Sequence, residues 1–285
     1  EPSATPNRER TAALVALSAL LLVASAAGAV AAGVALLPSL LPIGAAAALA
    51  VFEAVPARAR CVAMLAVVAA GTYAMPEAEG IADLFATLLL AGSLVIAAAG
   101  LHQSGAPAGR YPLMAALLLA VQALMRAETG LEFYLAWEFV TLACFFLIRG
   151  GTGAGAEVLR FLVFLLLAAF LLLAGFAMLA AQTGSTDLDA LRTAGPGTAL
   201  ALSLMAAGLL VKAAAVGVHV WLPAAYAEAP DEVTALLSAV VSKTAIFGLL
   251  LGGYAVSRSE AALDYGPALA WIGMATTVAG ALLAL

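Results

Sequence analysis

The feature that most constrains this chain is its succession of long apolar runs. A membrane-spanning helix needs ~20 mostly apolar residues, and ten runs near this length lie between charged residues and Pro or Gly breaks. They are 12–33, 37–53, 59–75, 82–100, 112–127, 131–149, 157–181, 197–219, 232–254 and 265–285. Hydrophobic residues make up 65% of the chain and charged residues 10%, whereas soluble domains have roughly half and a quarter. We therefore predict an all-α, multi-pass helical bundle in the inner (plasma) membrane of the cell.

The remaining composition excludes several kinds of function. The formal net charge of −5 leaves no basic surface for nucleic acid. Cys61 and Cys144 lie inside apolar runs without the spacing of metal ligands, so we expect two small buried hydrophobic residues. The glycine-rich stretch 150–155 lacks the Lys-Ser/Thr ending of a phosphate loop, and Asp231 and Glu232 are typical acids of a helix N-terminus. We expect neither a metal nor a cofactor.

Arginine is distributed unequally between the two predicted sides of the bundle. With the N-terminus inside, the inner loops carry Arg8, Arg10, Arg58, Arg60, Arg110, Arg149 and Arg160, and the outer loops carry Arg126, Arg192 and Arg258. This excess follows the positive-inside rule. It predicts that the loop 150–156 lies inside and the loop 184–196 outside.

The two lysines differ from the arginines. Every arginine lies at the end of a span or in a loop, whereas Lys212 and Lys243 lie inside apolar runs. An intramembrane lysine costs at least ~2.5–3.5 kcal/mol on insertion scales and usually marks a pathway or a charge pair. Lysine, unlike arginine, can lose its proton when desolvated. We interpret both lysines as proton-exchanging groups, with Ser238 and Ser242 able to hold water near Lys243; the alternative is that each lysine extends to an interface.

Glu138 is the carboxylate that matches these lysines. It lies between Trp137 and Phe139 inside the span 131–149, whereas the other acids near spans lie at their ends. A buried carboxylate and a buried ammonium can both stay charged if they pair across two helices. We therefore expect Glu138 and Lys212 to lie within ion-pair distance as a switching pair of a proton relay. A fixed structural ion pair is the alternative.

His219 lies in a segment that is typical of an interrupted helix. It follows Lys212 by seven residues, which is about two turns if the helix is continuous. An imidazole can pass protons near neutral pH, and a packing role is the alternative. Gly208 and Gly217 flank the lysine and Pro223 follows, as in broken membrane helices around a cavity.

The stretch 221–250, WLPAAYAEAPDEVTALLSAVVSKTAIFGLL, resembles a known motif. It is similar to the strongest motif of the proton-translocating, antiporter-like subunits of respiratory complex I, membrane-bound hydrogenases and Mrp-type cation/proton antiporters. That motif is a lysine, then H-x-W-L-P-x-A, A-P-x-x-V-[ST]-A-L-L and K-[TV]-x-x-[YF]. The matching residues are Lys212, His219, Trp221, Leu222, Pro223, Ala225, Ala229, Pro230, Val233, Thr234, Ala235, Leu236, Lys243 and Phe247. Upstream, Trp137, Glu138 and Phe139 resemble the F-W-E-[LF] helix of the family.

The resemblance implies an all-helical fold of two inverted five-helix repeats, each with a broken helix. Residues 1–111 would form N-terminal transmembrane helices, and residues 112–254 the first repeat, which carries the proton channel. Residues 255–285 would begin a following helix, with the second repeat absent from this chain.

The resemblance also assigns roles to single residues. Glu138 and Lys212 would form the switching pair, and Lys243 would be the relay residue of a central axis. His219 would take part in the relay, with Trp221, Pro223, Pro230, Ser238 and Ser242 in support. Ser238 stands where the family often has histidine, so an imidazole step at that position is not expected.

These features predict a proton-translocating subunit of a multi-subunit membrane complex. The resemblance implies Mrp-type cation/proton antiport or redox-coupled pumping, as in a quinone oxidoreductase whose redox centres lie in other chains. Its partners would be other membrane subunits, protons, sodium in the antiporter case, and lipid, but no nucleic acid. Two alternatives remain: a coupling subunit that powers uptake of another substrate such as inorganic carbon, and a scaffold subunit that conducts no protons.

Overall fold

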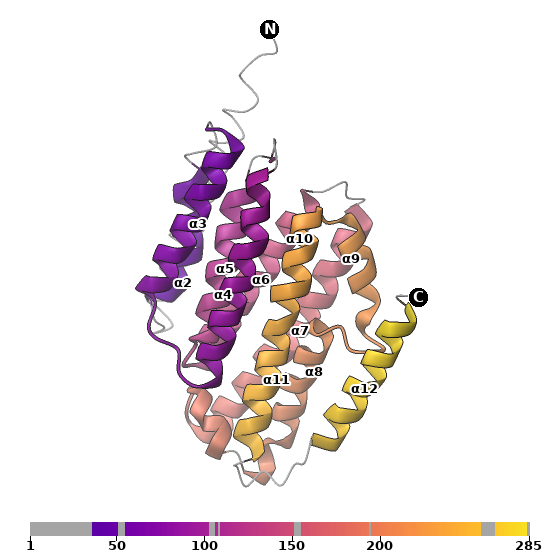
Figure 1. Cartoon of the computed structure of the whole chain (residues 1–285). Helices are drawn as coiled ribbons and strands as arrows, with labels where there is room; N and C mark the ends of the chain where they lie inside the picture. The colour runs from indigo at the N-terminus through magenta and orange to yellow at the C-terminus, as the bar shows by residue number, and fades with distance from the viewer. Residues whose placement is uncertain are drawn as a thin grey trace.

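The computed structural model describes residues 36–50, 55–102, 106–107, 109–150, 155–193, 195–257 and 266–283. These residues form helices joined by short loops and contain no β-strand. The helices stand side by side in one bundle, with α12 along one flank (Figure 1). The predicted all-α bundle is confirmed.

The helices follow one another in a simple order. The α-helices are α2 (Leu36–Ala50), α3 (Ala57–Ala74), α4 (Ile81–Ala99), α5 (Arg110–Met125), α6 (Gly130–Arg149), α7 (Gly155–Thr183), α8 (Ala199–Lys212), α9 (Leu222–Glu228), α10 (Asp231–Leu236), α11 (Ser242–Ser257) and α12 (Gly266–Leu283). Short 3₁₀ turns lie at η2 (Gly100–His102), η3 (Leu188–Thr193), η4 (Pro196–Thr198) and η5 (His219–Trp221). A π-helical turn, η6 (Leu237–Val241), joins α10 to α11.

Six helical units in the described part of the chain are long and apolar enough to cross a membrane: α3, α4, α6, α7, α10–α11 and α12. Three shorter apolar helices accompany them, at Leu40–Ala50, Arg110–Met125 and Ala199–Lys212. Every predicted span from 37–53 onward therefore has a helix, and 12–33 lies outside the described residues. The span predicted over 197–219 is too long, because α8 ends at Lys212.

Helix α5 is the centre of the bundle. Nearly all of its residues from Tyr111 to Met125 are buried, and it packs against α2, α3, α4 and α6. A helix that is apolar all round has no polar face to offer to water and belongs inside a packed bundle. By contrast, α12 has no buried residue.

Helix α6, which carries Glu138, begins at a capping box. The Thr129 hydroxyl accepts a hydrogen bond from the Glu132 backbone N–H at 3.1 Å, and the Glu132 carboxylate accepts one from the Thr129 N–H at 3.2 Å. The two side chains satisfy backbone donors that a helix start leaves without partners. This local signal sets the register of the helix that faces α8.

Helices α7 and α8 approach so closely that two positions need glycine. A Cβ on Gly208 would lie 2.5 Å from the Ala168 carbonyl oxygen of α7, and a Cβ on Gly175 would lie 2.8 Å from the Ala201 carbonyl oxygen of α8. Small residues at such crossings let membrane helices pack backbone to backbone. The contact holds the end of α8 against α7.

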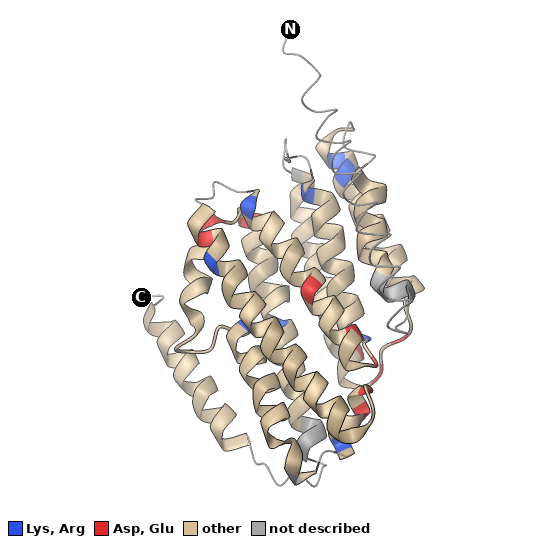
Figure 2. Cartoon of the chain, turned by 180° about the vertical axis from the view of Figure 1, so that it is seen from behind, with Lys and Arg blue, Asp and Glu red and all other residues tan. Residues whose placement is uncertain are grey.

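Basic residues gather at one end of the bundle. Arg58 and Arg60 lie in the first turn of α3, Arg110 begins α5, and Arg149 ends α6. Because successive helices run in opposite directions, these positions share one end. Figure 2 shows more of the basic residues there than elsewhere, with others at mid-height and toward the opposite end of the bundle. This end corresponds to the predicted inner side.

Single cysteines introduced at Ala156 and Thr186 are expected to react from opposite sides of the membrane. Both residues are exposed and they flank α7, whose 29 residues extend ~43 Å at 1.5 Å per residue. The native Cys61 and Cys144 are buried and should add little background. A membrane-impermeant maleimide added to one side at a time makes the measurement. Labelling of both positions from the same side would contradict a spanning α7.

Candidate functional site

The candidate site lies at the end of α8. After Lys212 the chain closes a Schellman motif, in which the Ala215 N–H donates to the Leu210 carbonyl at 3.0 Å and the Ala214 N–H donates to the Val211 carbonyl at 3.1 Å. Ala214 adopts a left-handed backbone with φ of 54°, where glycine is the usual residue. These hydrogen bonds therefore end α8 at Lys212.

Trp221 joins the two halves of the broken helix. It is buried and donates its indole N–H to the Val211 carbonyl at 3.0 Å. Its ring meets Phe161 of α7 edge to face, with centroids 5.5 Å apart. Pro223 lies in the first turn of α9, where its missing N–H costs no helical hydrogen bond. The predicted break near 212–223 is confirmed, and the Trp221 indole adds a second hydrogen bond to a carbonyl in the last turn of α8.

Replacement of Ala214 by glycine is expected to stabilise the protein. A non-glycine residue in the left-handed region destabilises the folded state by roughly 1–2 kcal/mol, and glycine avoids this cost. Glycine also raises the entropy of the unfolded chain, which lowers the free energy of unfolding by ~0.4–1 kcal/mol. We expect a net gain of up to ~1 kcal/mol, or a rise in Tm of about 2–4 °C. Thermal unfolding in detergent measures it. Ala213→Gly is the control, because Ala213 has ordinary right-handed backbone and should lose stability; a lower Tm for Ala214→Gly would contradict the assignment.

The Lys212 ammonium is buried against α6. The residue is 1% exposed, and its Nζ donates to Thr141 Oγ1 at 3.3 Å and to the Trp137 carbonyl at 3.5 Å. Nζ also lies 3.8 Å from the centroid of the Trp137 ring, a cation–π contact worth about 2 kcal/mol when desolvated. As the last residue of α8, the cation also faces the negative end of the helix dipole. All of these partners are formally neutral.

The predicted direct ion pair between Glu138 and Lys212 is not formed. None of the ion pairs in the described part of the chain joins them. Trp137 and Thr141 are one turn apart and face α8, while Glu138 lies about 100° further round α6 from Trp137 and is partly buried. Its carboxylate remains within electrostatic range of the Lys212 ammonium. The two groups are neighbours across a helix interface rather than contacting partners.

Lys243 follows directly on the π-helical turn η6. There the Ser242 N–H donates to the Leu237 carbonyl, five residues back. Single π turns within α-helices occur frequently at functional sites. The turn was not predicted from the sequence, because it has no side-chain pattern comparable to a cap.

The Lys243 side chain is partly buried and turns back along its own helix. Its Nζ donates to the Ser238 carbonyl at 2.7 Å and to the Ser242 hydroxyl at 3.3 Å. The Ser242 hydroxyl donates to the same Ser238 carbonyl at 2.8 Å. The structure therefore places both serines against the lysine, and no hydrogen bond or ion pair between described residues links Lys243 to Lys212.

His219 lies on the far side of the break, in η5. Its Nδ1 accepts a hydrogen bond from the Gly217 N–H at 3.3 Å. Because α8 has already ended at Lys212, the continuous helix that would align the two side chains is absent. The histidine is partly buried, and Pro230 lies further on, immediately before α10.

Two residues that hold Lys212 were missed by the sequence analysis. In the sequence Trp137 stands out only as a neighbour of Glu138 within the F-W-E-[LF] resemblance, and Thr141 belongs to no motif. The Thr141 hydroxyl also donates to the Trp137 carbonyl at 3.0 Å, an internal bond that makes a threonine unremarkable within a helix. The signal that could have found it is the four-residue spacing, which puts Thr141 on the same face as Trp137.

The described residues include no group of three or more His, Cys, Asp or Glu side chains placed to hold a metal. Cys61 and Cys144 are buried and free, as predicted from their apolar surroundings. The site therefore consists of two amines, a carboxylate, an imidazole and hydroxyl groups. Such groups can bind and release protons.

The match to known proteins covers the broken helix and both lysines. The family described as "NADH:quinone oxidoreductase/Mrp antiporter, TM" matches residues 127–285. NADH-quinone oxidoreductase subunit N of Desulforudis audaxviator is 31% identical over 196 residues, which cover 64% of this chain and 39% of that protein. The chain spans less than half the length of such curated relatives.

Two solved structures share the arrangement of helices. A chain of respiratory complex I from Thermus thermophilus aligns with a TM-score of 0.61 and 27% identity, over 75% of this chain and 52% of that one. A chain of the Mrp complex from Dietzia sp. DQ12-45-1b aligns with a TM-score of 0.57 and 23% identity, over 88% of this chain and 49% of that one. At this identity the second likeness shows a common fold. Because the family match covers more than half of the chain, this protein belongs to the NADH:quinone oxidoreductase/Mrp antiporter family of transmembrane proteins.

Proposed function

We propose that this chain is a proton-translocating subunit of a multi-subunit membrane complex and that protons move through Glu138, Lys212 and Lys243. The observation that carries the proposal is the setting of Lys212, a buried ammonium whose contacts are all neutral. We place the relay in one repeat over residues 112–254. This repeat would comprise α5, α6, α7, the broken α8–α9 helix and the α10–α11 unit.

A buried cation without a contacting counter-ion is costly, and the cost falls if the group loses its proton or reaches a nearby charge. Lysine can do both, whereas arginine keeps its proton. On α6, Glu138 and Thr141 are three residues apart, so their Cβ atoms lie about 5–6 Å apart. The Lys212 ammonium can therefore exchange Thr141 for the Glu138 carboxylate by rotating its own side chain. These two arrangements are the proposed states of the switch.

Lys243 is the proposed next carrier. It lies on α11, which packs against α8, and its ammonium is held by a carbonyl and a hydroxyl rather than by an acid. These neutral partners can hold either an ammonium or a neutral amine, so they permit proton exchange. His219, beyond the break, is proposed to pass protons between Lys212 and the water on that side.

The named relatives support redox-coupled pumping over cation antiport. Those above 25% identity are subunit N of a NADH-quinone oxidoreductase and a chain of respiratory complex I. The likeness to the Mrp complex is one of fold. In a redox-coupled complex the electron carriers would lie in other chains, and this chain would supply only the proton path.

Replacement of Glu138 by glutamine is expected to lower proton flux through the assembled complex by about 100-fold, the lower end of the contribution expected of a proton-transfer group. The amide keeps the size and hydrogen-bonding capacity of the side chain but cannot attract the Lys212 ammonium as a carboxylate does. Flux is measured in proteoliposomes with an entrapped pH-sensitive dye, and assembly is checked by size-exclusion chromatography.

Glu157→Gln is the matched control. Glu157 lies in the first turn of α7 and pairs at 2.9 Å with Arg160, whose side chain is about half exposed. A partly exposed ion pair within one helix contributes at most ~1 kcal/mol. This variant should keep full flux. Full flux in the assembled Glu138→Gln complex would overturn the proposed switch.

A further inference from the structure

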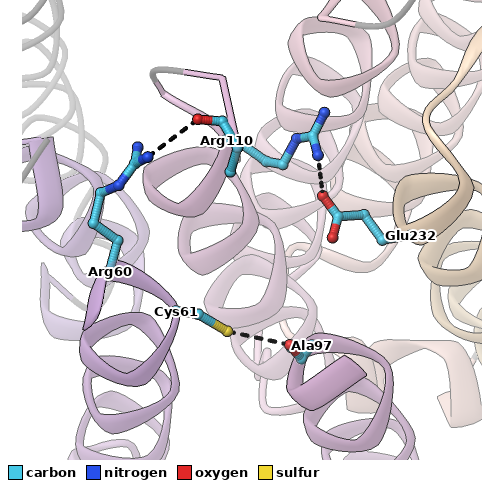
Figure 3. A network of polar contacts seen from close by, with 6 residues as sticks. Arg60, Cys61, Ala97, Arg110 and Glu232 are labelled. Atoms are coloured by element: carbon cyan, nitrogen blue, oxygen red, sulfur yellow. Dashed lines mark hydrogen bonds and ion pairs between the residues drawn. The ribbon is translucent and has the colours of Figure 1, made fainter. Parts of the chain in front are cut away.

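A second cluster of polar side chains lies at the end of the bundle that carries most of the basic residues. Four helices contribute: α3 brings Arg60 and Cys61, α5 brings Arg110 and Tyr111, α10 brings Glu232, and α4 brings the backbone near its end. Figure 3 shows Arg110 and Glu232 pointing toward one another and Cys61 pointing toward Ala97. The relay described above uses none of these groups.

Glu232 is the acid of this cluster. Its side chain is 5% exposed, and its Oε1 lies 2.5 Å from Nη1 of Arg110, whose side chain is 13% exposed. This bond occupies one carboxylate oxygen and leaves Oε2 directed elsewhere. The less buried arginine connects the pair to the surface.

The Tyr111 hydroxyl is the unusual atom of the cluster. Tyr111 is 1% exposed, and its Oη has no hydrogen-bond partner among the described residues. A buried hydroxyl without a partner has given up its hydrogen bonds to water and gained none in return, so such an atom needs an explanation. The neighbouring Cys61 thiol donates to the Ala97 carbonyl at 3.2 Å, and its sulfur lies beside the Tyr111 hydroxyl.

These atoms converge beside Gly100, where α4 passes into η2. A Cβ on Gly100 would lie 3.4 Å from Glu232 Oε2 and 3.7 Å from both Tyr111 Oη and Cys61 Sγ. Because glycine has no such atom, the three polar atoms lie around a position that no side-chain atom occupies. A buried water needs two to four polar partners, and here a carboxylate oxygen and a hydroxyl provide two, with the thiol beside them.

We propose that Glu232, Tyr111 and Cys61 hold a water molecule beside Gly100, and that Glu232 exchanges protons with the inner aqueous side through it. The second half of the proposal rests on the proposed proton-translocating function. A hydrated proton at the surface gives its proton to the bound water, which passes one of its own to Oε2. The products are a neutral Glu232 carboxyl group and a regenerated water, and release reverses both transfers.

The surroundings of Glu232 suit this exchange. The charged and titratable groups that face it are Arg110 and Tyr111 from α5 and Cys61 from α3, while α4 offers backbone. Arg60 of α3 lies over the Tyr111 ring and donates to the Ala106 carbonyl at 3.1 Å. Arg110 holds Oε1, so Oε2 is the oxygen that takes the proton. Glu232 also stands eleven residues before Lys243 in the α10–α11 unit, or ~16 Å along the helix. Glu232 would thus take up protons at the start of the α10–α11 unit, and Lys243 lies near the middle of the same unit.

X-ray radiolytic labelling of the intact complex tests the water. Hydroxyl radicals formed from bound water oxidise the side chains beside it, even where bulk water has no access. Tyr111 and Cys61 should be oxidised several-fold faster than Met114 and Met64. These methionines lie on the same two helices about one turn further on and are fully buried. The comparison of Tyr111 with Met114 is the stricter one, because a thiol is itself highly reactive toward hydroxyl radicals.

Gly100→Ala is the decisive variant. Gly100 has right-handed backbone, and the added methyl group would make ordinary contacts with the three polar atoms, so the fold should persist while the water is displaced. Labelling of Tyr111 should then fall to the rate of Met114. Gly92→Ala on the same helix is the control, since nothing lies within 4 Å of a Cβ there. Equal labelling of Tyr111 and Met114 in the wild type would overturn the water site.

Proton flux tests the role of the site separately. Gly100→Ala and Glu232→Gln should each lower flux several-fold in complexes that assemble normally, and Gly92→Ala should not. The Glu232→Gln complex could fail to assemble because Arg110 loses its charged partner. Gly100→Ala tests the site without removing that ion pair. Normal flux in an assembled Gly100→Ala complex would refute proton exchange at Glu232. It would leave the Glu138–Lys212 switch intact, because the Glu138→Gln variant tests that switch independently.

Discussion

Replacement of Lys212 by methionine is expected to lower proton flux by at least ~100-fold, the typical contribution of a proton-transferring group. The stability of the protein should not fall. Methionine has nearly the length of the lysine stem and suits the apolar surface of Trp137. Its thioether is uncharged, so the variant no longer carries a buried cation without a contacting anion. Replacing buried charged groups by apolar residues of similar volume is often neutral or stabilising by ~1–4 kcal/mol. The Thr141 hydroxyl stays satisfied through its own bond to the Trp137 carbonyl.

The combination of lost flux and kept stability is what distinguishes a relay from a structural role. Flux is measured in proteoliposomes and Tm in the same detergent preparation. Thr141→Val is the matched variant, since it keeps the ammonium and the side-chain volume but removes one neutral partner, and we expect a flux lowered only several-fold. If the assembled Lys212→Met complex conducts normally, the chain is a scaffold. If it does not assemble, the ammonium is a structural element.

Lys243→Arg is expected to lose flux nearly as completely as Lys243→Ala. Arginine can reach the Ser238 carbonyl and the Ser242 hydroxyl that now hold the lysine, so it can replace the charge and its hydrogen bonds. It cannot replace the exchange of a proton, because a guanidinium remains protonated in proteins. A residue needed only for its charge would accept this substitution.

Parallel flux measurements on the two Lys243 variants decide between these roles. Both complexes are first shown to assemble, and Lys243→Gln supplies a neutral side chain that can still bond to Ser238. All three variants should be inactive if the proton moves through the amine. Wild-type flux in the Arg variant would refute proton exchange at Lys243.

The sequence is a reliable guide to the helices because their signals are local. Apolar runs and the residues from Lys212 to Pro223 each act over a few turns, and they predict the spans and the break. The Thr129–Glu132 capping pair that begins α6 is an equally local signal. The end of α8 could be located only to within seven residues, because the Schellman motif uses an alanine, Ala214, where glycine would have marked the stop.

The side-chain partners were harder to predict because they depend on how two helices are rotated against one another. Glu138 was an obvious partner for Lys212 by charge, yet the register of α6 turns Trp137 and Thr141 toward α8 instead. Glu232 was expected to be an ordinary acid at a helix start. It is instead buried against Arg110, which lies 122 residues away in the chain.

The sequence by itself determined that this chain is a membrane-embedded helical bundle with two lysines and one acid inside apolar helices, because no water-exposed fold could hide so many apolar side chains. It also determined the family, through a motif in which a lysine, a tryptophan-proline break and a second lysine follow in order. Only the tertiary structure decided which atoms face the lysines. The packing of α7 on α8 through Gly175 and Gly208, and the register of α6 beside them, set the contacts of Lys212. A rotation of α6 or α8 by one residue would change these partners.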